Sequence, residues 1–271
     1  MKTIIIPDLH NKVQWVEKAL SAIPHDRVVF LGDYFDDFHD TPAIAENTAR
    51  WLKQSLQHEN RIHLYGNHDC PYSRWNNRFV ECPGYTDDKR KAINTILDRQ
   101  DWGKLKFLHK EQGWWISHAG IHSDIFSHPI HGVTDEEIER IHEQGTLAFN
   151  ANLNHPLFQW SAARGMANSF QVGGVTWLDW DVEFRPVDNI SQIVGHTICM
   201  KEILSYPVEQ KEQLNPIYMT RSRVVASEPS RNQVVIRNTD NWNLDCNCRV
   251  IGFIENEKFS WIPNTFIEKN P

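Results

Sequence analysis

The sequence lacks several features that would place it at once in a membrane-bound or disordered class. It contains no low-complexity tract and no run of like charges, so we expect no disordered tail in its 271 residues. The apolar run at residues 3–6 is broken by Pro7 and is too short for a signal-peptide core or a membrane span. We therefore expect a soluble protein that makes no use of a membrane.

Cysteine is scarce and does not form a recognisable binding pattern. The five cysteines are an odd number, and Cys246 and Cys248 are one residue apart, which is the wrong spacing for a zinc knuckle. No cleavable signal precedes them, so we expect a cytoplasmic protein with reduced thiols. We interpret the cysteines as small buried side chains.

Positive charge is also in short supply. The formal net charge is −7 and no basic cluster is present, so bulk electrostatics do not favour nucleic-acid binding. Phosphate substrates are not excluded, because cations held in a site would dominate the local field. The length suits one large domain, and we expect a single domain over residues 1–271.

The first third of the chain alternates predicted strands and helices. Short apolar runs at residues 3–6, 27–31 and 61–65 predict buried strands. A helix is predicted between each pair, and the second begins with Thr41 as its N-cap and Pro42 at its first position. Strands separated by helices indicate parallel β-α-β units, whose functional residues gather after the carboxyl ends of the strands.

The second half of the chain has a different pattern. Residues 113–117, 190–194, 233–237 and 250–254 read as strands with fewer helices between them, which predicts a second sheet of more antiparallel character. We interpret residues 123–175 as an irregular insertion or lid. It contains one clear helix signal, a capping box formed by Thr134 and Glu137.

Five polar loops follow apolar runs directly, and together they form a metal-ligand pattern. They are Asp8-Leu9-His10, Gly32-Asp33-Tyr34-Phe35-Asp36, Gly66-Asn67-His68-Asp69, Ser117-His118-Ala119-Gly120 and Gly195-His196-Thr197. An Asp and a His two residues apart can share one metal, and a carboxylate after the next strand can bridge two. An amide oxygen and two further imidazoles can complete a second metal. This oxygen and nitrogen set suits manganese, iron, zinc or nickel, and argues against a structural zinc site.

These motifs resemble those of the calcineurin-like metallophosphoesterase superfamily, in the branch of the phosphoprotein phosphatases and bis-nucleoside tetraphosphatases. The resemblance spans about residues 4–200, and the tail from Asn238 to Trp261 looks like the closing hairpin of that branch. It implies an α/β fold with a two-sheet β-sandwich flanked by helices in four layers. It also implies two divalent transition-metal ions, of which manganese is the preferred candidate. The ions would be held by the residues Asp8, His10, Asp33, Asn67, His118 and His196.

The resemblance further implies hydrolysis of a phosphate ester or anhydride by direct attack of a metal-bridging hydroxide. His68 would be the general acid for the leaving group, and Asp36 would hold it protonated. Arg, which usually follows this second Asp in the branch, is replaced by Asp37. Another cation would have to bind the phosphoryl oxygens, and Arg74, Arg164 and Arg185 are candidates.

The substrate stays open between a phosphorylated small molecule, a nucleotide and a phosphoprotein. The alternatives are a Ser/Thr phosphatase, a dinucleoside polyphosphate hydrolase, or a binding scaffold with this fold that has lost catalysis. A silent scaffold should lack metal ligands or the general acid. This sequence keeps all of these residues, which favours an enzyme.

Overall fold

A computed structural model of the chain describes residues 1–37, 39–74, 81–122, 125–126, 133–164, 171–180, 182–185, 187–198 and 239–267. Its helices are α1 (Val16–Ala22), α2 (Pro42–Ser55), α3 (Cys70–Ser73), α4 (Asp87–Ile96), α5 (Arg99–Trp102) and α6 (Asp135–Asn150), with 3₁₀ turns at Pro156–Phe158 and Ala162–Arg164. Its strands are β1 (Lys2–Ile6), β2 (Arg27–Phe30), β3 (Arg61–His63), β4 (Leu108–Glu111), β5 (Trp114–Ser117), β6 (Ser191–Val194), β7 (Asn241–Asn243), β8 (Val250–Glu255) and β9 (Lys258–Pro263).

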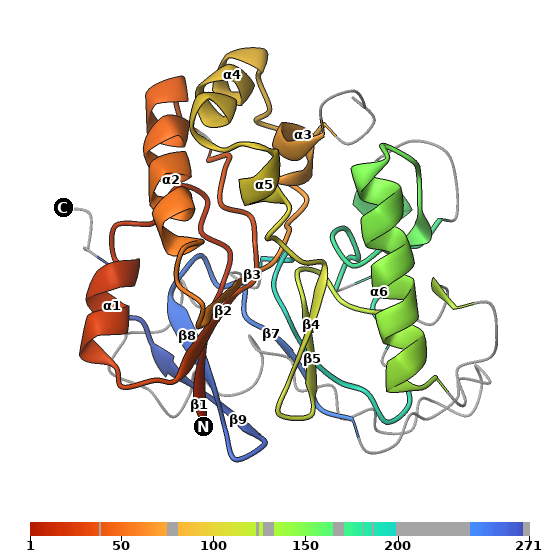
Figure 1. Cartoon of the computed structure of the whole chain (residues 1–271). Coiled ribbons are helices and arrows are strands. Elements are labelled where there is room, and N and C mark those ends of the chain that lie inside the picture. The colour runs from red at the N-terminus through yellow and green to blue at the C-terminus, as the bar shows by residue number, and fades with distance from the viewer. Residues whose placement is uncertain are drawn as a thin grey trace.

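The strands form two sheets that lie in the middle of the molecule (Figure 1). The first sheet has the order β3-β2-β1-β8-β9, with β1, β2 and β3 parallel and the β8–β9 hairpin antiparallel to β1. The second has the order β4-β5-β6-β7, in which β5, β6 and β7 are parallel. Helices α1 and α2 lie on one side of the pair and α6 on the other, so the predicted two-sheet α/β fold is confirmed.

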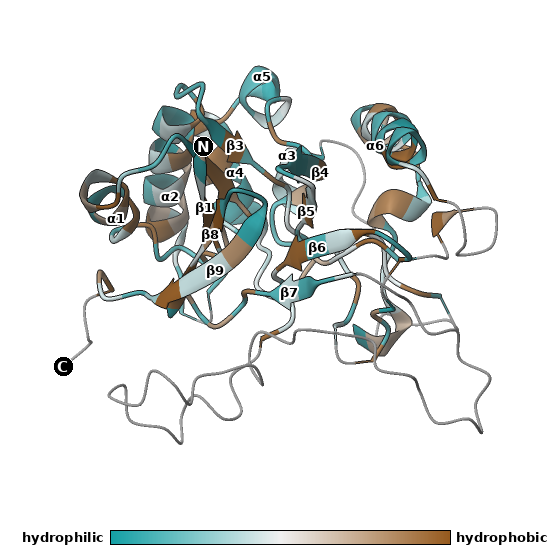
Figure 2. Ribbon diagram, turned by 90° about the horizontal axis from the view of Figure 1, so that it is seen from below, coloured by the Kyte–Doolittle hydropathy of each residue, from teal (hydrophilic) through white to brown (hydrophobic). Residues whose placement is uncertain are grey.

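Alternation of side chains along the strands explains this layering. In β1, Ile4 and Ile6 belong to the core that includes the α1 and α2 side chains, whereas Ile5 belongs to the core between the sheets. In β5, Ile116 faces the first sheet and Trp115 packs on the opposite side. Because both faces of the inner strands are covered, most of their residues are hydrophobic, and Figure 2 shows β1 and β8 in brown at the centre.

The helix signals in the sequence correspond to real caps. The side chain of Thr41 accepts a hydrogen bond from the backbone N–H of Ile44, and Pro42 is the first residue of α2. Thr134 and Glu137 form the predicted capping box at the start of α6. No helix in the described part of the chain is long and apolar enough to cross a bilayer.

The second sheet differs from its prediction in two respects. It is mostly parallel, and the strand at residues 250–254 pairs with β1 in the first sheet instead of joining the second. The reason is the edge of β1 that β2 leaves unpaired: β8 pairs with this edge, and a tight turn at Asn256 and Glu257, both with positive φ, folds β9 back on β8. The strand predicted at 233–237 lies outside the described residues.

Candidate metal centre

The parallel strands of both sheets end at the same edge of the sandwich, and there the predicted metal ligands meet. Asp8 and His10 follow β1, and the other members each follow a strand of their own: Asp33 follows β2, Asn67 follows β3, His118 follows β5 and His196 follows β6. We call these six residues the ligand cluster. All except His10 are buried. The cluster is therefore assembled from both sheets at their carboxyl ends.

Asp8, His10 and Asp33 form the first group, with one ligand atom of each lying within 4.8 Å of the others. The Nδ1 atom of His10 is 3.1 Å from the carbonyl oxygen of Phe35 and 2.7 Å from that of Asp36, so it must carry the proton and donate. The Nε2 atom of a neutral ring then has a free lone pair, and it lies 3.6 Å from Asp33 Oδ2. Nitrogen and oxygen lone pairs thus face one another.

The second group surrounds His118. Its Nδ1 donates to the carbonyl oxygen of Leu31 at 2.9 Å, which leaves Nε2 of the neutral ring as an acceptor. That Nε2 lies 3.0 Å from Asn67 Oδ1, 3.2 Å from His196 Nδ1 and 3.4 Å from Asp33 Oδ2. A single proton on Nε2 could not satisfy all three neighbours. A cation held between them would, so these residues fit a divalent metal ion.

The surroundings of the Asp8 and Asp33 carboxylates also fit a bound cation. Asp8 Oδ2 accepts a hydrogen bond from the backbone N–H of His196 at 2.9 Å, but its buried Oδ1 has no hydrogen-bond partner. A Cβ atom on Gly195 would lie 2.0 Å from this oxygen, and one on Gly66 would lie 2.0 Å from Asp33 Oδ1. Glycine is thus required at these two positions for the ligand carboxylates to approach the backbone.

Asp69 fixes the residue shared by the two groups. Its carboxylate accepts hydrogen bonds from the backbone N–H groups of Asp33 (2.8 Å), Tyr34 (2.9 Å) and Gly66 (2.8 Å). Asp33 Oδ1 in turn accepts from the backbone N–H of His68 at 2.9 Å. The loops after β2 and β3 are therefore locked together around the Asp33 carboxylate, and Oδ2 is left to face His10 and His118.

Several of these side chains lie on left-handed backbone. The φ angles are 43° at His10, 50° at Asp33, 65° at Asp36 and 70° at His196. L-residues rarely adopt this region, and it turns the chain sharply as it leaves a strand. The sharp turns direct the side chains back toward the edge of the sheets.

Buried charges in the cluster shift one another. Burial alone would lower the pKa of His118, but Asp33 and Asp8 outweigh it and raise the pKa to about 10. Burial opposes ionisation of Asp33 too, yet His118 and His68 hold the pKa of its carboxyl well below the usual range. Burial and the neighbouring His118 lower the pKa of His196. Without a bound cation, the protonated ring of His118 therefore supplies part of the positive charge that offsets the buried carboxylates.

A second set of side chains stands beside the ligand cluster. His68 Nδ1 donates to Asp36 Oδ2 at 3.0 Å, as predicted for these two residues. Tyr72 donates its hydroxyl to Asp36 Oδ1, and Lys89 Nζ lies 2.6 Å from the same oxygen and 3.0 Å from Asp40 Oδ1. We call His68, Asp36, Tyr72, Lys89 and Asp40 the acid network. Burial lowers the pKa of His68, but Asp33 and Asp36 outweigh it and raise the pKa.

The three candidate arginines have different surroundings. Arg74 is buried, its guanidinium lies 4.9 Å from the ring centre of Phe149, and it donates to a backbone carbonyl. Arg185 donates to the carbonyl of the preceding residue. Arg164 Nη2 donates to Thr197 Oγ1 at 2.7 Å, directly beside His196. Among the side-chain contacts of the described residues, that of Arg164 thus reaches a loop that carries a ligand-cluster residue.

Comparison with known proteins identifies the family. The model of the calcineurin-like phosphoesterases matches residues 1–200, which include the whole ligand cluster. The chain belongs to the calcineurin-like phosphoesterase family. It is accordingly a hydrolytic phosphoesterase, of a family that works with divalent metals.

One solved structure shares the fold of this chain, and a second is less similar. The cold-active protein-tyrosine phosphatase of the psychrophile Shewanella sp. superposes with a TM-score of 0.54 at 16% identity, covering 98% of this chain and 78% of that one. A metallophosphoesterase from Sphaerobacter thermophilus gives 0.40 at 13% identity, covering 97% and 87%. No curated protein matches the sequence.

Sequence reasoning missed part of the acid network. Lys89 and Tyr72 lie on α4 and α3, and neither directly follows a strand as the ligand-cluster residues do. The described cysteines are buried, as predicted, and Cys82 has a further contact: Asn67 Nδ2 donates to its sulfur at 3.5 Å. Burial and contact to distant loops distinguish these residues, and neither is visible in a short motif.

Proposed function

We propose that this phosphoesterase is binuclear, with manganese as its metal. Asp8, His10 and Asp33 would hold the first ion, and Asp33, Asn67, His118 and His196 the second. The observation that carries the proposal is the convergence of Asn67 Oδ1, His196 Nδ1 and Asp33 Oδ2 on His118 Nε2, within 3.0 to 3.4 Å. Two such ions, when bound, activate a water for in-line attack on phosphorus and offset the charge of the phosphoryl oxygens.

The remaining steps fall to groups of the chain itself. His68 would protonate the leaving oxygen from the side of the acid network, because its Nδ1 is fixed by Asp36 and its ring is only partly buried. Arg164 would bind a phosphoryl oxygen. Its position supports this role: Nε lies 2.8 Å from Asp179 Oδ2, and Nη2 is bonded to the residue after His196.

Metal content tests the proposal directly. Protein stripped of metal and reloaded with manganese should bind two equivalents, and turnover should rise with the second. Full activity with one equivalent or none would rule out the binuclear arrangement. The same loading with nickel, zinc and magnesium identifies the metal that supports the highest rate.

A substrate panel addresses the specificity. It should contain an alkyl phosphate, p-nitrophenyl phosphate, diadenosine tetraphosphate, and phosphoserine and phosphotyrosine peptides. The Shewanella protein is described as a protein-tyrosine phosphatase, which is a reason to include phosphotyrosine. Arg164→Lys and Arg164→Gln should raise KM for every hydrolysed member if this side chain binds the phosphoryl group that they share.

A further inference from the structure

The loop between β7 and β8 carries a buried carboxylate that belongs to none of the five metal-ligand loops. Asp245 is 1% exposed, and its Oδ1 accepts a hydrogen bond from the backbone N–H of Asn247 at 3.2 Å. Its Oδ2 is buried and has no hydrogen-bond partner. A buried carboxylate oxygen without a donor is costly, so a native structure that keeps one calls for an explanation.

Hydrogen bonds join this loop to the two loops that carry Asp8 and His196, which are the first and last residues of the ligand cluster along the chain. Cys248 Sγ donates to the carbonyl oxygen of Asp8 at 2.9 Å, and Asn243 Nδ2 donates to that of Thr197 at 2.8 Å. The backbone N–H of Asp245 donates to Asn243 Oδ1 at 3.0 Å. Asp245 is therefore fixed between the loop after β1 and the loop after β6.

The charge of Asp245 acts on the first group of ligands. Burial and then the neighbouring Asp245 raise the pKa of Asp8 well above its ordinary value. Burial also raises the pKa of Asp245, and His10 is the strongest charge opposing this. Among the described residues, no lysine or arginine forms an ion pair with Asp8, Asp33 or Asp245. Within the described part of the chain, the ion-pair partners of Asp8 and Asp33 are thus histidines, and Asp245 adds a third buried carboxylate.

We propose that Asp245 is a further acidic residue of the metal centre, which strengthens the binding of a divalent cation by Asp8, His10 and Asp33. The inference rests on the proposed binuclear centre. Asp245 does not belong to the group whose ligand atoms lie within 4.8 Å of one another, so it acts through its charge and not as a direct ligand. Partners of this kind around metal ligands typically contribute a factor of about 10 to 100 in affinity.

The test compares Asp245→Asn with the wild type in manganese titration and in thermal unfolding, with and without metal. We expect the affinity for one of the two ions to fall about 10- to 100-fold, with the other nearly unchanged. The metal-free variant should unfold at the same temperature as the wild type or higher, since an uncompensated buried charge is gone. Manganese should then raise its unfolding temperature less than it does for the wild type.

Asp240→Asn is the matched control, because Asp240 precedes β7 at the opposite end of that strand, with its N–H bonded to Ser191. It should leave both affinities unchanged. Equal loss of stability in Asp245→Asn with and without manganese would show a purely structural residue and overturn the inference. So would unchanged affinity for both ions. A wild type that binds two ions but hydrolyses no ester would defeat the proposed function alone, and the titration would still decide the role of Asp245.

Discussion

The ligand cluster and the acid network lie side by side, but they differ in how their polar atoms are paired. In the acid network, the Asp36 carboxylate receives a hydrogen bond or ion pair from His68, Tyr72 and Lys89. In the ligand cluster, potential ligand atoms converge on His118 Nε2, with Asn67 Oδ1 at 3.0 Å, and without metal a proton on this ring offsets the negative charge. The acid network thus contains its own cation, whereas the ligand cluster fits an added one.

This difference indicates which part of the site depends on metal. Substitutions in the ligand cluster should act through metal content, and those in the acid network should leave metal content intact. A substitution that did not follow this division would contradict it. Four measurements test the division.

The largest effect is expected at Asp33, because its carboxylate is shared by both groups of ligands. Asp33→Asn should lose both ions and roughly 10³-fold or more in activity, beyond the 10- to 100-fold typical of groups around metal ligands. His10→Ala and His196→Ala should each lose less metal. Elemental analysis beside turnover measures this. If Asp33→Asn kept two ions and normal turnover, Asp33 would be a structural turn residue.

His68→Asn should keep both ions and lose activity according to the leaving group. An alkyl alcohol must be protonated as it leaves, so the loss should be about 10²- to 10⁴-fold with an alkyl phosphate. It should be clearly smaller with p-nitrophenyl phosphate, whose phenolate leaves readily as an anion. Asp36→Asn should show the same pattern in milder form. Equal losses on both substrates, or loss of metal, would remove His68 from its role as acid.

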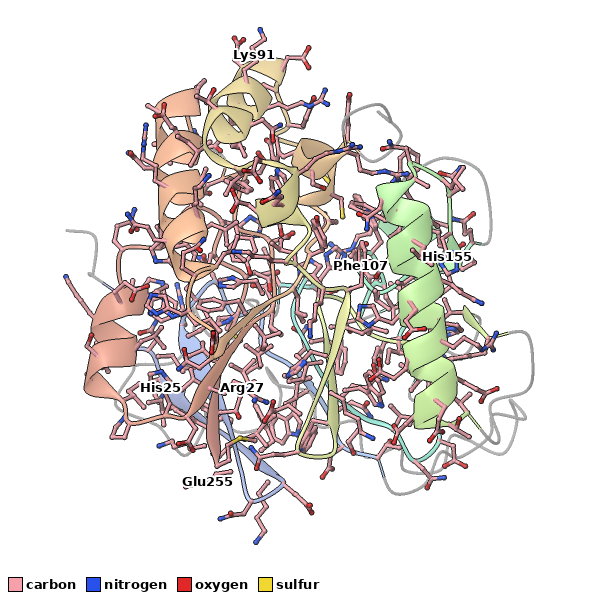
Figure 3. The ribbon with its side chains drawn as sticks, in the orientation of Figure 1. His25, Arg27, Lys91, Phe107, His155 and Glu255 are labelled. Atoms are coloured by element: carbon pink, nitrogen blue, oxygen red, sulfur yellow. The ribbon has the colours of Figure 1, made fainter. Side chains whose placement is uncertain are left out.

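Lys89→Met should have a smaller effect on activity and a clear one on stability. It leaves Asp36 and Asp40 buried without their cation, which typically costs about 3–5 kcal/mol. Activity on an alkyl phosphate should fall about tenfold as Asp36 loses its fixed position, and Lys89→Arg should recover part of it. Lys91→Met is the control, because Lys91 lies two residues further along α4 and extends into solvent (Figure 3). The measurements are denaturant unfolding and rates on both substrates. If Lys89→Met matched Lys91→Met in both, Lys89 would have no role in the acid network.

The smallest effect concerns pH and the metal-free protein. The folded pKa of His118 is raised to about 10, above its ordinary 6.5, so its protonated ring stabilises the fold fully below pH 6.5. That contribution is lost as the pH rises through about 10. His118→Gln should thus lower the unfolding temperature by about a few degrees at pH 6, and by less near pH 10. A constant difference across this range would contradict the ion pair with Asp33.

The sequence predicts the ligand cluster well because each member follows a strand at a short, readable distance. Parallel strands bring their carboxyl ends together, so order along the chain becomes proximity in space. Lys89 could not be found this way, since nothing local separates it from the exposed Lys91. Asp245 follows β7, which has only three residues, Asn241–Asn243, and no apolar run to mark it. The sequence also could not show which sheet β8 joins. That choice depends on the unpaired edge of β1, which exists only once the sheet has assembled.

The left-handed backbone at His10, Asp33, Asp36 and His196 has a consequence for how such a protein can change over time. Each of these conformations costs an L-residue about 1–2 kcal/mol that glycine would avoid. Glycine at any one of them would relieve this backbone cost, but it would also remove a side chain on which the chemistry depends. Substitutions that relieve the backbone at these four positions would therefore be expected to cost activity, which limits how this part of the chain can change.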